Sequence, residues 1–120
     1  MNGAIQRHAA SLGLADHVTF HGFQPQARVH ELLSAADLYV QSSLHEAAGV
    51  SVLEAAAHGV PTVGTLAGYV ADWSPTKAVS VGDAIAESLA DAILAMHGDD
   101  DRRRSMAALA RTFVVAHDAA

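Results

Sequence analysis

The feature that most constrains the fold is one stretch, residues 38–63, in which a strand, a loop, a helix and a second strand follow one another. Its first part, Leu38–Val40, is an apolar run typical of a buried strand. The alanine-rich segment Val50–His58 has the composition of a helix, and Gly59 stands where a glycine commonly ends one. Pro61 prevents the helix from continuing and opens the next strand. This order predicts a strand–helix–strand unit with a ligand site at the carboxyl end of a parallel strand.

The rest of the chain also alternates between helices and strands. Helical spacing of apolar residues predicts helices at residues 4–12, 27–36, 84–97 and 99–117. Further strands are expected at Val18–His21 and Val79–Val81. The order predicts an α/β fold, with a Rossmann-like parallel sheet flanked by helices. In the last two helices we expect these residues to face the core: Ile85, Leu89, Ile93, Met96, Met106, Leu109, Phe113 and Val114.

Composition narrows the classes of partner. A chain of 120 residues is one domain at most, and half of its residues are hydrophobic, enough for a real core. The formal net charge of −6, with Lys77 the single lysine, argues against nucleic acid or an anionic membrane as the main partner. The run Arg102–Arg104 follows Asp99–Asp101, a pattern typical of a solvated helix start.

Metal and targeting signals are absent from the sequence pattern. Without cysteine there are neither disulfides nor thiolate metal ligands, and the eight histidines show no HxH or HExxH spacing. We therefore expect no metal or other cofactor. The first residues are too polar for a signal peptide, and no apolar run approaches the length of a membrane span, so a cytoplasmic protein is expected.

Two carboxylates bracket the start of the central helix. If the helix opens at Val50, its first turn presents free N–H groups and a positive dipole end, which suit a phosphate or pyrophosphate. Glu46 precedes that end and Glu54 lies about one turn inside, while the small residues 47–49 let the backbone approach a ligand. Carboxylates accept hydrogen bonds from the vicinal hydroxyls of a sugar or ribose, so the pattern suits a nucleotide-sugar. Alternatively, Glu46 is simply an exposed loop residue and Glu54 a solvated helix residue, and neither binds a ligand.

The same residues carry a resemblance to a known family. The sequence SSLHEAAGVSVLEAAAHGVPTVGT, residues 42–65, resembles the donor-site signature of retaining glycosyltransferases of the GT4 family, which have the two-domain GT-B fold. Glu46 and Glu54 match that family's Glu-x7-Glu pair. LGLADHVTFHGF (12–23) resembles the strand leading to the nucleotide-base loop, and VGDAIAESLADAI (81–93) resembles a helix late in the family's C-terminal domain. The resemblance extends over almost the whole chain.

The resemblance implies a role for each matching residue. Glu46 would be the catalytic-site carboxylate that contacts the donor sugar, and Glu54 would bind the ribose hydroxyls. The implied donor-binding residues are Ser43, Glu46, Ala47, Ala48, Gly49, Val50, Glu54, Gly22 and Phe23, with the last two near the base. Ala48 replaces a bulkier residue and Ser42 replaces a proline of the family pattern, and both departures would widen the sugar pocket. The family uses a nucleotide-sugar donor; the resemblance implies neither a metal nor a particular acceptor.

Parts of the family's pattern find no counterpart in these residues. We expect residues 1–120 to form a single partial nucleotide-sugar-binding domain, without the acceptor domain and without the first two strands. In the family, the first of these strands carries an Arg and a Lys that neutralise the diphosphate. Such a piece alone is expected to be inactive. Either Val18–His21 then pairs directly with Leu38–Val40, or the exposed sheet edges are covered by self-association or another chain. Two other functions stay open: a non-catalytic nucleotide-sugar-binding module or partner subunit, and a purely structural remnant.

Overall fold

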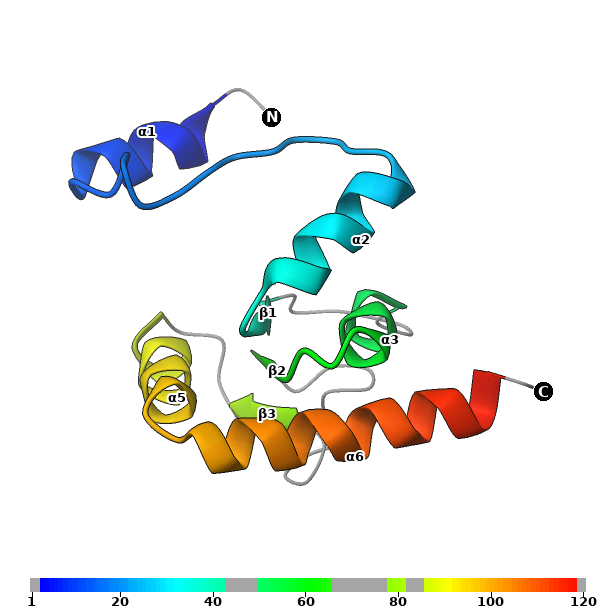
Figure 1. Ribbon diagram of the computed structural model, residues 1–120. Helices are drawn as coiled ribbons and strands as arrows, with labels where there is room; N and C mark the ends of the chain where they lie inside the picture. The colour runs from blue at the N-terminus through cyan, green and yellow to red at the C-terminus, as the bar shows by residue number, and fades with distance from the viewer. Residues whose placement is uncertain (1–2, 43–49, 66–77, 82–85, 119–120) are drawn as a thin grey trace.

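The computed structural model describes residues 3–42, 50–65, 78–81 and 86–118 (Figure 1). The elements in chain order are α1 (Ala4–Ser11), α2 (Gln26–Ala35), β1 (Tyr39–Gln41), α3 (Val50–Ala57), β2 (Thr62–Thr65), β3 (Ala78–Val81), α5 (Ala86–His97) and α6 (Asp100–Asp118). Every helix predicted from the sequence is present, with ends that agree within one or two residues. Gly59 follows α3 with a φ of 73°, the left-handed conformation expected of a glycine that ends a helix.

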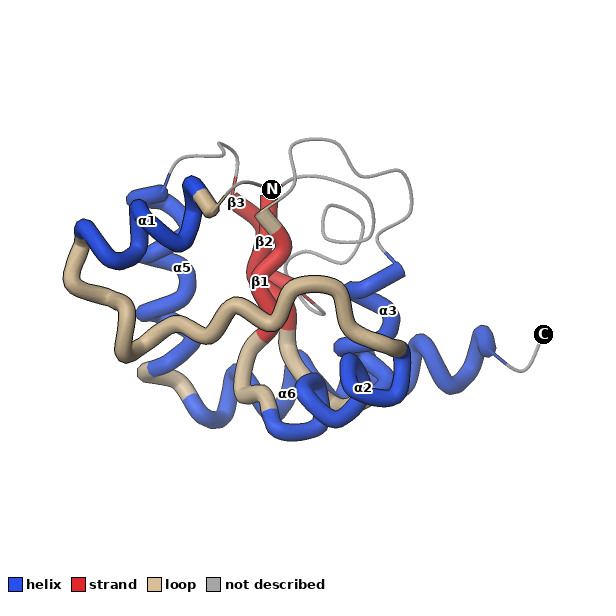
Figure 2. Tube along the Cα trace, turned by 90° about the horizontal axis from the view of Figure 1, so that it is seen from above, coloured by secondary structure: helices blue, strands red, loops and turns tan. Residues whose placement is uncertain are grey.

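The three described strands form one parallel sheet in the order β1-β2-β3. Tyr39 pairs with Thr62, and Thr62 pairs in turn with Ala78. The connection from β1 to β2 runs through α3, as a parallel pair requires a crossover. In Figures 1 and 2, α3 and α5 lie on opposite sides of the strands, and α6 runs from one helix to the other. The predicted α/β fold with a parallel sheet is confirmed.

Two apolar clusters form the core, and α6 contributes to both. Val52 and Ala56 of α3 pack with Ala110 of α6 in one cluster. In the other, Val63 of β2 packs with Met96 of α5 and Met106 of α6. Most of the core positions predicted for α5 and α6 lie in or against these clusters: Leu89, Ile93, Met96, Met106, Phe113 and Val114.

Leu109 was wrongly predicted to face the core, because its side chain is 50% exposed. The buried stripe of α6 runs through Met106, Ala107 and Ala110. At 3.6 residues per turn, Leu109 lies to one side of this stripe, although it is three residues from Met106.

In the described part of the chain, no helix has both the length and the apolar character needed to cross a bilayer.

The strand predicted at Val18–His21 is wrong. This segment belongs to an extended connection between α1 and α2, and Val18 and Phe20 are 39% and 43% exposed. A strand exists only where its N–H and C=O groups pair with a neighbour, and none of the described strands lies beside it. Of the two alternatives given for this segment, direct pairing with Leu38–Val40 is therefore wrong, because β1 pairs with β2 alone among the described strands.

The junction between α5 and α6 is fixed by side chains of the acidic run Asp99–Asp101 and the basic run Arg102–Arg104. Asp99 Oδ1 accepts a hydrogen bond of 3.0 Å from the backbone N–H of Arg102, which caps the start of α6. Arg103 Nη1 donates to the carbonyls of Met96 and His97, each at 2.6 Å, and its Nη2 pairs with the Asp100 carboxylate. One guanidinium thus satisfies the last carbonyls of α5 and one acid at the start of α6. The helix start predicted from these charges is confirmed.

Replacing Arg103 by alanine should lower the free energy of unfolding by about 1–3 kcal/mol, because it removes charged hydrogen bonds to two helix-terminal carbonyls. Arg104→Ala is the matched control, since Arg104 pairs with Asp101 and both side chains are largely exposed. The control should change stability by less than about 1 kcal/mol. Urea unfolding followed by circular dichroism measures both. Equal losses in the two variants would contradict the assigned role of Arg103.

Candidate functional site

The parallel strands direct their carboxyl ends toward one edge of the sheet. β1 ends at Gln41, β2 at Thr65 and β3 at Val81. The helix that follows β1 begins at Val50, as predicted, so its free backbone N–H groups belong to the same edge. The connecting residues 43–49 lie outside the described residues. The predictions for Ser43, Glu46, Ala47, Ala48 and Gly49 therefore stay predictions.

Gln41 is a buried polar residue at this edge. Its Oε1 accepts a hydrogen bond from the hydroxyl of Tyr39, two residues earlier on the same face of the strand. Tyr39 in turn packs against the apolar cluster of α3 and α6. The sequence prediction ended the first strand at Val40, whereas Gln41 is the last residue of β1.

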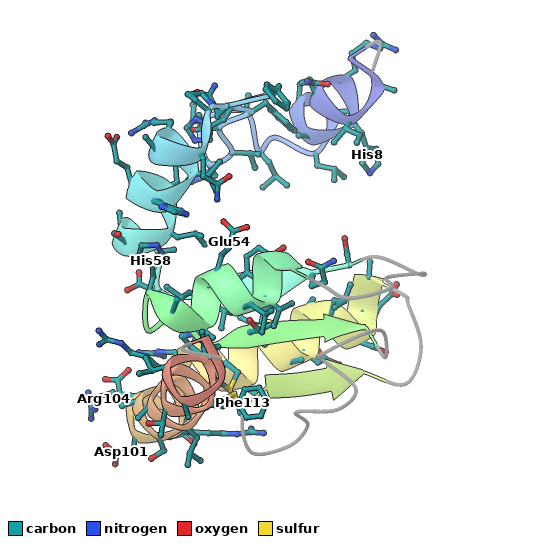
Figure 3. The ribbon with its side chains drawn as sticks, turned by 90° about the vertical axis from the view of Figure 1, so that its right-hand side faces the viewer. His8, Glu54, His58, Asp101, Arg104 and Phe113 are labelled. Atoms are coloured by element: carbon teal, nitrogen blue, oxygen red, sulfur yellow. The ribbon has the colours of Figure 1, made fainter. Side chains whose placement is uncertain are left out.

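Glu54 lies in the second turn of α3 on the side that faces α2, away from the sheet (Figure 3). Its side chain is 25% exposed. Gln26 Nε2, at the start of α2, donates a hydrogen bond of 2.7 Å to Glu54 Oε2. His30 Nε2 lies 3.5 Å from the same oxygen. Glu54 is therefore an anchored, half-buried carboxylate, and the alternative of a freely solvated helix residue does not describe it.

The contact between α2 and α3 continues as a line of polar groups, here called the polar seam. Ser34 Oγ lies 3.1 Å from His58 Nδ1, and the rings of His30 and His58 have centroids 5.1 Å apart. The seam is built from residues spaced four apart on each helix, which lie on one helix face. Its members are Gln26, His30 and Ser34 of α2, Glu54 of α3, and His58, which directly follows α3.

The polar seam is not arranged as a metal site. Within the described ranges, no three His, Cys, Asp or Glu side chains form a group that could hold a metal ion.

The sequence prediction did not identify the residues of the polar seam that contact Glu54. Gln26 and Glu54 are 28 residues apart, and only the fold brings them together. The available signal was the spacing of four between polar residues on both helices, which is also common on solvated faces.

Gly22 and Phe23, predicted to lie near a nucleotide base, belong to the loop that precedes α2. Gly22 has a φ of 64°, and the Phe23 side chain is completely exposed. Gln24 Nε2 donates to the carbonyl of His21 at 2.6 Å, which closes the loop locally. The loop ends at Gln26, whose side chain binds Glu54. The structure thus brings the predicted base loop and the predicted ribose carboxylate to the same end of α2.

Comparison with known proteins gives one family for these residues. The family described as "Glycosyl transferases group 1" matches residues 2–113. The D-inositol 3-phosphate glycosyltransferase of Nocardia farcinica is 39% identical over 107 residues, which are 86% of this chain and 23% of that protein. The chain therefore spans about a quarter of the length of this relative.

Solved structures show the same fold. Sucrose-phosphate synthase from Thermosynechococcus elongatus superposes with a TM-score of 0.85 and 27% identity, covering 93% of this chain and 29% of that one. The Anabaena protein HepE, solved in complex with UDP-glucose, superposes with a TM-score of 0.83 and 23% identity. The match covers 93% of this chain and 31% of the HepE chain, and at that identity it shows the fold alone. The predicted partial Rossmann-like domain of the GT-B type is confirmed. The chain belongs to the group 1 glycosyltransferases.

Proposed function

We propose that this chain is the donor-binding part of a glycosyltransferase that uses a nucleotide-sugar and, like the GT4 family it resembles, transfers the sugar with retention. The observation that carries the proposal is the position of Glu54. This carboxylate is anchored on the helix that follows the first of the three described parallel strands, in a chain of the group 1 family. Its spacing from Glu46 matches the Glu-x7-Glu pair.

Each part of the donor has a proposed partner. The N–H groups at the start of α3 face the diphosphate, which suits an anion without the help of a metal ion. Glu54 accepts hydrogen bonds from the ribose hydroxyls, and the exposed ring of Phe23 packs against the base. Glu46 contacts the sugar as the catalytic-site carboxylate, together with Ser43 and the backbone of residues 47–50.

The proposed substrate class is supported by the family, which matches residues 2–113, and by the Nocardia relative, which is a glycosyltransferase by name. We carry over the class, a nucleoside diphosphate sugar, and not the particular base or sugar. We also propose a cytoplasmic location, and self-association or cover by another chain for a sheet that is expected to be incomplete in these residues.

Glu54→Gln should weaken binding of a nucleoside diphosphate by roughly ten- to hundredfold, because a hydrogen bond to a charged acceptor contributes about 1.5–3 kcal/mol and an amide keeps only part of it. Calorimetric titration with UDP, GDP and ADP measures the change. Glu31→Gln makes the same change of charge on the exposed face of α2, where Glu31 pairs with Arg28. If this control loses as much affinity, Glu54 does not bind the ribose.

Glu46→Gln should weaken binding of the nucleotide-sugar and spare the bare nucleoside diphosphate, since the proposed contact of Glu46 is with the sugar alone. Titrating each variant with UDP and UDP-glucose, or the corresponding pair for the preferred base, separates the two roles. Equal losses for both ligands in both Glu46 and Glu54 variants would show that the roles are wrongly assigned.

The 120 residues expressed alone should bind donor weakly and should not turn it over. The sequence predicts that part of the family's sheet is missing from these residues, and incomplete sheets favour association, so self-association is expected in sedimentation velocity. A donor-hydrolysis assay on the same sample tests turnover. A stable monomer that releases sugar from a nucleotide donor would contradict this expectation. Binding by the protein at its natural length, without any transfer, would favour the non-catalytic binding module instead.

A further inference from the structure

Glu54 is contacted through one of its two oxygens. Gln26 Nε2 at 2.7 Å and His30 Nε2 at 3.5 Å both approach Oε2. The first distance is that of a good hydrogen bond, whereas the second is at the limit of one. In the part of the chain that the structure describes, no residue is bonded to Oε1. The Gln26 amide is therefore the group that orients this carboxylate.

The amide of Gln26 is itself held from a second direction. Its Nε2 lies 3.0 Å from His30 Nε2 as well as 2.7 Å from Glu54 Oε2. A primary amide has two N–H groups, so Gln26 can donate one to the carboxylate and, when His30 carries its proton at Nδ1, the other to the ring. The reversed amide would place its oxygen against the carboxylate, where two acceptors repel each other. The donor orientation of Gln26 is thus fixed by its neighbours.

The two ends of this contact are attached to the fold in different ways. Glu54 stands on α3 beside Val52, Ala55 and Ala56, which are all buried, so its backbone is fixed by the core. Its side chain still has three rotatable bonds, and a ligand that requires one orientation must select it. Gln26 is the first residue of α2, directly after Pro25. Its hydrogen bond selects the orientation before any ligand arrives.

We propose that Gln26 is a positioning residue for nucleoside recognition: it holds Oε2 of Glu54 and leaves Oε1 to accept a ribose hydroxyl. The inference rests on the proposed function, in which Glu54 binds the ribose. Because Gln26 follows Phe23 by three residues, one short segment carries both the contact with the base and the orientation of the ribose-binding carboxylate. A role that only ties α2 to α3 would belong equally to Ser34, which contacts His58 and not Glu54.

The test uses the protein at its natural length, with three variants. Gln26→Met keeps the size of the side chain but removes the donor, Gln26→Glu turns the donor into an acceptor, and Ser34→Ala removes another bond of the polar seam. UDP, GDP and ADP are each titrated beside their 2′,3′-dideoxy analogues, which lack the ribose hydroxyls. Urea unfolding of every variant measures the loss of folding stability, so that a structural effect is distinguished from an effect on binding.

Gln26→Met should weaken binding of the nucleoside diphosphate roughly three- to tenfold, the range of one neutral-donor hydrogen bond, and Gln26→Glu should weaken it more. Neither variant should change the affinity for the dideoxy analogue, and Ser34→Ala should change neither affinity. A Gln26→Met variant that binds both ligands as the unmodified protein does, while Glu54→Gln loses affinity, would overturn this inference and leave the proposed function standing. Equal losses for both ligands would also overturn it. If no nucleotide binds, or Glu54→Gln binds normally, the proposed function falls and the inference with it.

Discussion

The close packing of α3 against α6 is the interaction on which the rest of the structure depends. Val52 and Ala56 of α3 meet Ala110 of α6, and all three are almost completely buried. Small side chains let the two helix axes approach, and the burial of one face of α3 fixes the rotation of the helix about its axis. The opposite face, which carries Glu54 and His58, is thereby directed toward α2 (Figure 3). The alanine-rich sequence of α3 thus determines where its carboxylate lies.

The site combines a rigid element with a weakly attached one. α3 is fixed by the sheet and by α6, whereas α2 has no fully buried residue and meets α3 through the polar seam. A neutral hydrogen bond of such a seam contributes only about 1 kcal/mol to stability, and the bond from Gln26 to the Glu54 carboxylate about 1.5–3 kcal/mol, because water competes for the same groups. The polar seam therefore defines geometry more than it supplies stability, which is consistent with a role in orienting Glu54.

Local patterns were sufficient to predict the helices, but they did not show which extended segments pair with one another. The helix from Val50, its end at Gly59 and the parallel sheet all follow from residue types and their order along the chain. The segment Val18–His21 has the alternation of a strand, but pairing is a non-local property, and this segment belongs to no sheet among the described residues. Leu109 failed for a related reason, since spacing from one core residue does not give the centre of the buried stripe.

The residues of the candidate site also fall into two groups: those that the sequence predicts and those that only the fold reveals. Glu54 was identified from its spacing to Glu46 and from the resemblance, both of which are properties of a continuous stretch of sequence. Gln26 was not, because its contact with Glu54 joins two helices 28 residues apart and appears only when α2 and α3 are placed together. Residues that touch a ligand often lie within one motif, whereas the residues that orient them come from wherever the fold supplies a neighbour. Here that neighbour stands at the end of the loop predicted to meet the base, so the fold links two contacts that the sequence presents as separate.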